Sequence, residues 1–319
     1  VYLYSAQNPG ERFRSIEFNV KCHGFGVGGA GDVTIDNFTV KYVGVHGVGA
    51  GTCRNLTVSN CEFAWIGGSI QAEGIFGRDH PTRLGNAVEI YGGCDGYVVT
   101  NCCFAQVYDA GVTHQFNIPN TAGEKRYDEK NVVFADNVFD TCNYSIEYFL
   151  TAPDGNASRM ENLLYANNLM FDAGRGFCEQ RPDRDQGAHI KAWFHGNRNR
   201  AKNYVVRNNV FCGAGDMLVQ ICAGLKNLDG SSSLPTMADN VFVGRAGQQF
   251  GMVSDTSDRR ETYGPGTQAY VDRFGPGNRC VFVADADVVM CPDGDVRTIQ
   301  GALEQVRALR ASGAIPAGR

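Results

Sequence analysis

Acidic side chains between apolar neighbours recur at similar distances behind a repeated block of the sequence. Because successive side chains of a strand point to opposite faces, the central residue of each segment is expected outside when its neighbours are buried. This alternation predicts one polar column made of Glu89, Thr113 or His114, Glu147, Glu179 and Gln220. The segments that carry it are Val88-Glu89-Ile90 on an inserted strand, and Val112-Thr113-His114, Ile146-Glu147-Tyr148, Cys178-Glu179-Gln180 and Val219-Gln220-Ile221 at about eight or nine residues behind their blocks.

Carboxylates stacked at strand spacing could cleave a glycosidic bond. Adjacent strands lie about 4.8 Å apart, which predicts a carboxyl separation of roughly 5 Å for Glu147 and Glu179 and about 9.6 Å for Glu89 and Glu147. Retaining glycosidases hold their two carboxyls about 5–5.5 Å apart and inverting ones about 6.5–9.5 Å apart. One of two such close carboxylates is expected to have a raised pKa and to act as the general acid. The alternative is a solvated charged ladder, which like-charge repulsion between neighbouring strands disfavours.

Further polar residues surround this column in the sequence. Asp109 and His114 lie in the segment YDAGVTHQ and are expected to tune the carboxylate pair. His189, Lys191 and Trp193 alternate along AHIKAW, so an extended strand would point all three to one side. Together with Arg181, whose guanidinium can bind a carboxylate in a bidentate way, they are predicted to hold a sugar, with Glu89 and Gln220 as further substrate-binding residues of the column. The alternative is an ordinary polar loop with one buried Trp.

A ten-residue block, clearest at residues 95–104 (DGYVVTNCCF), supplies the strands that must position these residues. Apolar residues fill its third and fifth positions, as Tyr97 and Val99 do here, which is the alternation of a half-buried strand. Repetition of such a block predicts a solenoid in which each strand pairs in parallel with its own copies. We therefore expect an all-β chain that forms a single-stranded right-handed parallel β-helix. A leucine-rich repeat is disfavoured because its Leu-x-x-Leu-x-Leu frame is absent. Blocks begin at Gly31, Arg54, Asp95, Lys130, Glu161, Lys202 and Ser233.

The seventh position of every block is Asn or Asp, which predicts a corner with left-handed backbone because these side chains tolerate that conformation. The column consists of Asn37, Asn60, Asn101, Asp136, Asn167, Asn208 and Asp239. At the other end of the chain, residues 295–310 have apolar side chains at helical spacing, which predicts an amphipathic helix that caps the solenoid. We interpret residues 1–319 as a single domain. The start at Val1, without Met or a leader, suggests a mature product or an excised piece with further coils upstream.

Composition narrows the function further. The 29 basic and 34 acidic residues give a net charge of −5 without a basic stripe, which argues against nucleic acid as a partner. No apolar run is long enough to span a membrane. The 12 cysteines show no CxxC or metal-type His/Cys spacing, and Cys61, Cys102 and Cys103 stand inside the blocks, so we expect small buried apolar residues there. Neither a metal nor another cofactor is expected.

The blocks, together with GNAVEIYGGCD (85–95), YDAGVTHQ (108–115), YSIEYF (144–149), EQRPD (179–183) and HIKAW (189–193), resemble bacterial right-handed parallel β-helix proteins of the pectate-lyase-like superfamily. The resemblance covers about residues 1–225 and implies a secreted, cell-surface or periplasmic protein that acts on polysaccharides as a hydrolase, lyase or epimerase. The paired Asp motifs of polygalacturonases and the acidic cluster that binds calcium in pectate lyases are absent from this chain.

Three functions follow as hypotheses. The first is a monomeric glycoside hydrolase with Glu147 and Glu179 as the nucleophile and acid. The second is a metal-independent polysaccharide lyase in which Lys191 or His189 abstracts a proton from a uronic acid and Arg181 neutralises its carboxylate. The third is a carbohydrate-binding or surface repeat protein without catalytic activity. Only a lyase would form an unsaturated sugar, which absorbs ultraviolet light.

Overall fold

The computed structural model describes residues 4–283 apart from 17, 19, 75–78, 119–125, 154, 182–186, 193–198, 246–247, 256–260 and 263. The amphipathic helix predicted at 295–310 and the predicted sugar-binding residue Trp193 lie outside the described residues. The helices within this part of the chain are short: α1 (Pro9–Arg12), η2 (Gly176–Gln180), α2 (Thr267–Val271) and η3 (Asp272–Phe274). None of these described helices is long and apolar enough to cross a membrane.

Most of the described chain is β-strand, arranged in three long sheets that we call A, B and C. In order, sheet A contains β1 (Phe25–Gly26), β4 (Val48–Ala50), β9 (Val88–Tyr91), β12 (Ala110–Asn117), β15 (Tyr144–Thr151), β18 (Ala188–Ala192), β21 (Met217–Cys222), β24 (Gln249–Ser254) and β25 (Glu261–Thr262). Sheet B contains β2 (Gly31–Asp36), β5 (Cys53–Ser59), β10 (Cys94–Thr100), β13 (Asp128–Ala135), β16 (Arg159–Ala166), β19 (Ala201–Arg207) and β22 (Thr236–Ala238). Sheet C contains β3 (Thr39–Lys41), β6 (Glu62–Ile66), β11 (Cys103–Val107), β14 (Val138–Asp140), β17 (Leu169–Ala173), β20 (Val210–Ala214), β23 (Val241–Arg245) and β26 (Arg279–Val283).

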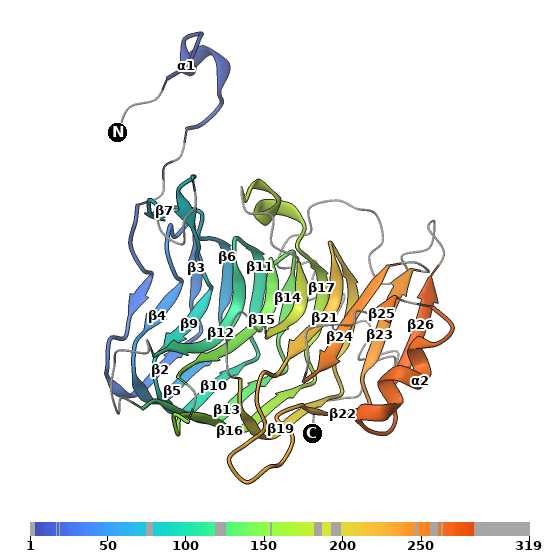
Figure 1. Ribbon diagram of the computed structural model, residues 1–319. Helices are drawn as coiled ribbons and strands as arrows, with labels where there is room; N and C mark the ends of the chain where they lie inside the picture. The colour runs from blue at the N-terminus through green and yellow to red at the C-terminus, as the bar shows by residue number, and fades with distance from the viewer. Residues whose placement is uncertain are drawn as a thin grey trace.

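Consecutive strands pass from sheet A to B to C and back to A, as β9, β10, β11 and β12 do, so that like strands stack side by side along the molecule (Figure 1). We call one such set of three strands a repeat. All pairings in the three sheets are parallel except that of β24 with β25. A separate antiparallel hairpin, β7 (Ile70–Ala72) and β8 (Thr82–Arg83), lies between β6 and β9. The prediction of a β chain built on parallel sheets is confirmed, and the arrangement is compatible with a β-helix.

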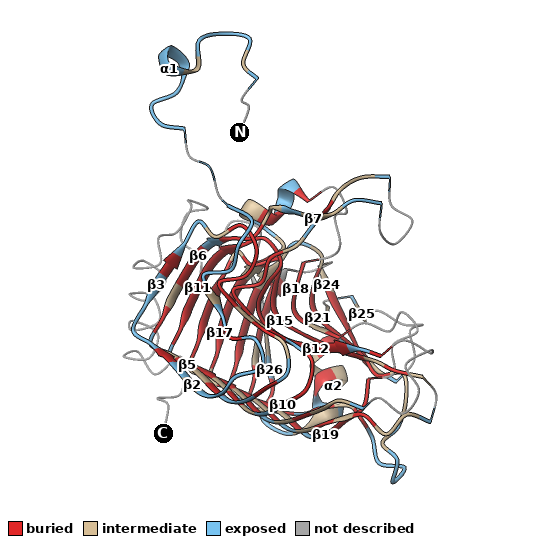
Figure 2. Ribbon diagram, turned by 90° about the vertical axis from the view of Figure 1, so that its left-hand side faces the viewer, coloured by how far each residue is buried: buried red, intermediate tan, exposed pale blue. Residues whose placement is uncertain are grey.

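The ten-residue blocks form the strands of sheet B and continue into sheet C. Their fifth positions lie in register and are fully buried, as predicted: Val58, Val99, Phe134, Tyr165 and Val206. Phe63, Phe104 and Phe139 stack in the same interior from sheet C, with ring centres 5.3 and 4.8 Å apart. Each large side chain buried in this way contributes about 1.5–3 kcal/mol. Buried residues therefore run along the strands of all three sheets, whereas the segment with α1 is exposed and stands away from them (Figure 2).

The corner between sheets B and C has the predicted left-handed backbone. All seven Asn or Asp residues of the block have φ between 52° and 61°. Side chains also bond along this column, as between Asn101 Nδ2 and Asn60 Oδ1 at 3.0 Å. Directly inside it runs a second, buried ladder, in which Asn168 Nδ2 donates to Asn209 Oδ1 at 2.9 Å. The members of this inner ladder are Asn137, Asn168, Asn209, Asn240 and Asn278.

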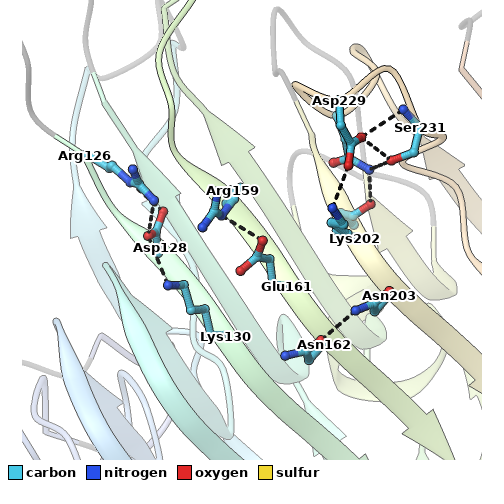
Figure 3. A network of polar contacts seen from close by, with 12 residues as sticks. Arg126, Asp128, Lys130, Arg159, Glu161, Asn162, Lys202, Asn203, Asp229 and Ser231 are labelled. Carbon is cyan, nitrogen blue, oxygen red and sulfur yellow. Dashed lines mark hydrogen bonds and ion pairs between the residues drawn. The ribbon is translucent and has the colours of Figure 1, made fainter.

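Charges alternate in sign across the outer face of sheet B (Figure 3). Lys130, Glu161 and Lys202 occupy facing register positions on β13, β16 and β19. Arg159 Nε adds an ion pair to Glu161 at 2.9 Å, and Lys202 Nζ lies 2.6 Å from Asp229. Exposed pairs contribute little energy individually, but a shift by one residue would move this column to the other face. We interpret the alternation as a device that favours the correct register.

Candidate active site

A cavity of about 490 Å³ opens on the outer face of sheet A. Part of its lining comes from β9, β12, β15 and β18 of the sheet, and part from the β7–β8 hairpin and the segment that follows it. Gly85 (φ 149°) approaches Gly67 so closely that no side chain would fit between them, which closes the base of the segment that carries the hairpin. The lining residues are His46, Gln71, Ala72, Thr82, Leu84, Asn86, Glu89, Tyr91, Asp109, Gln115, Glu147, Phe149, Arg181 and Lys191.

The predicted polar column exists on sheet A, with one member wrong. Thr113, and not His114, stands between Glu89 and Glu147, because its neighbours Val112 and His114 point into the core. Next to Glu147 the register places Lys191, which was predicted to bind the sugar but not to belong to this column. The complete column is Glu89, Thr113, Glu147, Lys191 and Gln220.

Glu179 does not occupy the position beside Glu147. It lies on the exposed side of η2 and forms an ion pair with Arg175 at 3.3 Å, and it is not among the residues that line the cavity. The prediction placed it by a fixed offset behind the block. Here η2 and the chain up to residue 187 come between β17 and β18, so the strand of sheet A starts later than that offset expects.

Glu147 and Lys191 form a buried ion pair on this face. Oε1 of Glu147 lies 2.9 Å from Nζ of Lys191, with 9% and 18% of the two side chains exposed. Nζ also lies 4.2 Å from the centre of the Tyr144 ring, a position that stabilises an ammonium ion. Burial raises the pKa of Glu147, and the positive charge of Lys191 opposes that rise.

Asp109 and Arg181 form the second ion pair of the cavity. Nη1 of Arg181 lies 2.6 Å from Oδ1 of Asp109, and both side chains are almost fully buried. The same Nη1 also donates to the carbonyl of Tyr108 at 3.4 Å. The structure thus places Asp109 and Arg181 at the cavity, where the sequence predicted them.

Glu89 differs from these two carboxyls because no Lys or Arg among the described residues forms an ion pair with it. Its partners are Asn86, which donates to Oε2, and His46, whose Nε2 lies 3.3 Å from Oε1. Nδ1 of His46 accepts the backbone N–H of Asn86 at 3.0 Å, so the neutral ring carries its hydrogen on Nε2, facing Glu89. Burial, with the nearby charges of Asp109 and Glu147, raises the pKa of Glu89 to about 8, and burial lowers that of His46 to about 4. At neutral pH Glu89 therefore holds a proton.

Several buried polar atoms at the site have no hydrogen-bond partner in the described part of the chain. Oγ1 of Thr82 and Nε2 of Gln71 belong to the hairpin and line the cavity. Oγ1 of Thr113 and the whole amide of Gln220 are unpaired in the column of sheet A. Such atoms are costly unless water or a ligand satisfies them. Hydroxyl groups of a sugar are suitable partners for those that line the cavity.

The structure places neither His114 nor His189 at the cavity, where the sequence predicted them. Both rings are fully buried and neither lines the cavity. His114 points into the core, where it contacts Glu129 at 2.7 Å and Tyr165 at 2.5 Å. His189 lies near the start of β18 and bonds to the carbonyl of Gly213 at 2.7 Å. Burial lowers the pKa of His114 to about 3 and is the main cause that lowers that of His189 to about 4.

Other residues of the cavity were missed or left without a role. His46 stands alone in GVHGVG, and nothing in the sequence links it to Glu89, 43 positions later. Asn86 and Gln115 carried a usable signal: Asn86 precedes the strand of Glu89 in GNAVEIY, and Gln115 follows Thr113 by two residues, the spacing of one strand face. Within the described ranges, no group of three or more His, Cys, Asp or Glu side chains is arranged to hold a metal ion.

Comparison with known proteins adds no relative. No protein-family model matches the chain, and neither a curated protein nor a solved structure matches it.

Proposed function

We propose that the chain is a single-stranded right-handed parallel β-helix that hydrolyses glycosidic bonds of a polysaccharide, acting as a secreted or cell-surface monomer. Support for the β-helix comes from the regular succession of strands through sheets A, B and C. Support for the hydrolase comes from the cavity on sheet A, which has the size of a small-molecule site and collects three carboxyl groups.

The observation that carries the proposal is the contrast between Glu89 and the other two carboxyls. Asp109 and Glu147 each form an ion pair, with Arg181 and Lys191 respectively, and the charge of Lys191 opposes the rise that burial causes in the pKa of Glu147. Glu89 has the uncharged partners His46, Asn86 and Gln115 beside it, and its pKa is raised to about 8. A carboxyl that keeps its proton, near one that is paired with a cation, is the division of roles that glycoside hydrolysis requires.

In this mechanism Glu89 is the general acid and Glu147 the general base. The proton of Glu89 passes to the glycosidic oxygen while the bond from that oxygen to the anomeric carbon breaks. A water molecule attacks the anomeric carbon and gives its proton to Glu147. The two residues are two strands apart on sheet A, about 9.6 Å at the usual strand spacing. This separation is at the upper limit for inversion of the anomeric configuration, for which carboxyls are about 6.5–9.5 Å apart, and is too long for retention.

The test is incubation of the chain with soluble xylan, polygalacturonate, alginate and carboxymethyl cellulose. We expect new reducing ends from at least one polymer, without ultraviolet absorbance of an unsaturated sugar, and a first product with inverted anomeric configuration by proton NMR. Release of reducing ends by a Glu89→Gln variant at the parent rate would contradict the assignment of the acid. Binding of a polymer without any cleavage would identify a carbohydrate-binding protein instead.

A polysaccharide lyase is the second candidate, supported by the two cations of the cavity, Arg181 and Lys191. Either could bind the carboxylate of a uronic acid. As a base, however, Lys191 would have to lose its proton, and both Glu147 and the face of Tyr144 stabilise its charged form. The hydrolase is therefore favoured. An unsaturated product in the same incubations would reverse this order.

A further inference from the structure

We propose that Tyr42, Trp65 and Phe177 form an aromatic platform beside the cavity, on which further sugar rings of the bound polysaccharide stack. This inference rests on the proposed function, because the occupant is the part of the same polymer that extends out of the cavity. The platform would make the protein selective for long chains over short ones.

The first argument is the backbone at the corner between sheets C and A. Residues at this corner have left-handed backbone, including Tyr42 (φ 59°) and Trp65 (φ 57°). A bulky side chain in this conformation is strained, because its Cβ atom comes too close to the following carbonyl oxygen. At the other two corners the described residues with left-handed backbone are all Asn, Asp or Gly, which tolerate it. The corner between C and A therefore retains unfavourable residue types, which calls for a compensating role.

Two other unfavourable residues of this corner have a visible role. Oε1 of Gln106 accepts the backbone N–H of Phe177 at 2.7 Å and so holds η2 in place. Oγ1 of Thr141 in turn accepts the backbone N–H of Gln106 at 3.3 Å. Tyr42 and Trp65 are different, because they remain 59% and 37% exposed. Packing in the core therefore does not explain why a bulky aromatic residue occupies either of these left-handed positions.

The second argument is continuity with the cavity. The ring of Trp65 lies 5.7 Å from that of Phe177, which lies 5.2 Å from that of Tyr108. The guanidinium of Arg181, which lines the cavity, lies 5.8 Å from the ring of Tyr108. Tyr42 extends the surface by one repeat, because its backbone N–H donates to the carbonyl of Ala64, the residue before Trp65. A polymer that leaves the cavity past Arg181 thus meets exposed aromatic faces.

The chemistry of this surface identifies the occupant as a sugar. Aromatic rings are large and apolar, with a negative face that attracts the C–H groups of a pyranose ring. Tyr42 and Trp65 come from neighbouring repeats, which are about 4.8 Å apart, close to the length of one sugar unit. Neither a charge nor a hydrogen-bonding group is needed at this position, so the platform would contribute affinity and leave cleavage to the cavity.

The experiment replaces Trp65 by Asn, which tolerates the left-handed backbone, and likewise Tyr42→Asn. Phe38→Asn is the matched control, since Phe38 is an exposed aromatic residue (50%) that does not belong to the platform. Binding is measured by retardation in native gels, each containing one of the four polysaccharides. Every protein in these gels also carries Glu89→Gln, which prevents cleavage. Turnover is measured for the polymers and for a short aryl glycoside without that change. We expect roughly fivefold weaker binding and a raised KM on the polymer for the platform variants, with kcat on the aryl glycoside unchanged.

Each alternative outcome is decisive. If Trp65→Asn and Tyr42→Asn bind and cleave the polymer like Phe38→Asn, the platform is overturned while the hydrolase stands. A parallel loss on polymer and aryl glycoside would make Trp65 a mere support for η2 and would also overturn it. Retarded migration of the parent without cleavage, abolished by Trp65→Asn, would refute the hydrolase and uphold the platform. If none of the four polymers retards the parent, the platform is rejected.

Discussion

Oε1 of Glu147 lies 2.9 Å from Nζ of Lys191, and the two residues occupy facing positions on neighbouring strands of sheet A. Both side chains are largely buried. Charges removed from water in this way depend on each other, because either one alone would remain desolvated without compensation. The Glu147–Lys191 ion pair and the carboxyl of Glu89, two strands away, determine most of the stability and activity that we expect of the site.

Removal of one partner of this pair should be strongly destabilising. We expect Lys191→Met to lower the free energy of unfolding by about 3–5 kcal/mol, because it leaves Glu147 buried and unpaired. The double variant Glu147→Gln/Lys191→Met should regain most of the loss. Urea denaturation of the parent, the two single variants and the double variant measures this coupling. Simple additivity of the single effects would contradict a direct interaction.

Replacement of Glu89 by Gln should remove catalysis and keep the fold. A general acid contributes about 10²–10⁴-fold, so polymer hydrolysis should fall by this factor. Activity on an aryl glycoside with a good leaving group should survive, because that bond needs no protonation. Glu179→Gln is the matched control, since Glu179 is exposed and outside the cavity, and it should retain parental activity. Equal losses in both variants would argue against Glu89.

The Glu89→Gln variant should also be more stable than the parent at neutral pH. The pKa of Glu89 is raised from 4.5 to about 8 in the folded protein, so the unfolded chain binds fewer protons between these values. Stability is therefore lost as the pH rises from about 4.5 to about 8, and Glu89→Gln removes this loss. The free energies of unfolding of parent and variant, obtained from melting curves, should agree at pH 4 and differ by several kcal/mol at pH 8. A constant difference across this range would show that Glu89 titrates normally. Parental kcat/KM should also fall above about pH 8, as the acid loses its proton.

His114 should make the protein sensitive to acid. Its pKa is lowered from 6.5 to about 3 by burial, so the unfolded chain takes up a proton that the folded protein does not. This contribution to stability is complete above pH 6.5 and is lost progressively as the pH falls towards 3. We expect His114→Gln to be less stable at neutral pH but to show a shallower decline in acid. Urea denaturation at a series of pH values measures both slopes, and equal slopes would contradict this account.

The two Asn ladders should respond differently to substitution. Asn168 is fully buried, donates to Phe134 O and Asn209 Oδ1 at 2.9 Å, and accepts from Asn137. Asn168→Ala leaves these groups unpaired and should cost about 3 kcal/mol or more. At the neighbouring position, Asn167→Gly keeps the left-handed backbone and should cost less than about 1 kcal/mol, because it loses one half-exposed hydrogen bond to Asp136. Thermal melting of both variants gives the comparison.

Much of the fold could be predicted from the sequence because the same pattern of apolar and Asn residues recurs in each repeat. Alternation in the blocks identified the buried positions of Val99 and Tyr165, and the recurrent Asn identified the corner. The outer column of sheet A could be predicted only where the connection to the next strand has a regular length. That condition holds for Thr113 and Glu147 and fails behind β17, where η2 separates Glu179 from the strand that carries Lys191. Glu89 follows the insertion with the β7–β8 hairpin, and only its apolar neighbours identified its place in the column.

Partners within the cavity were harder to predict, because a pattern along one strand says nothing about its neighbours across the fold. His46 reaches Glu89 from an earlier repeat, and Arg181 reaches Asp109 across 72 positions. His114 shows the converse problem. A shift of one residue separates the inside of a strand from its outside, and the sequence left Thr113 and His114 open as alternatives.

The parallel register between repeats also bears on how the chain is made. Contacts between successive repeats join residues close in sequence, as Ser59 and Asp36 at a separation of 23 or Asn101 and Asn60 at 41. A strand leaving the ribosome therefore needs only the repeat synthesised just before it as a template. We expect structure to grow in the direction of translation, each repeat offering its open edge to the next. A ribosome that stalls midway would then hold an ordered nascent chain, protected from proteases up to its last complete repeat.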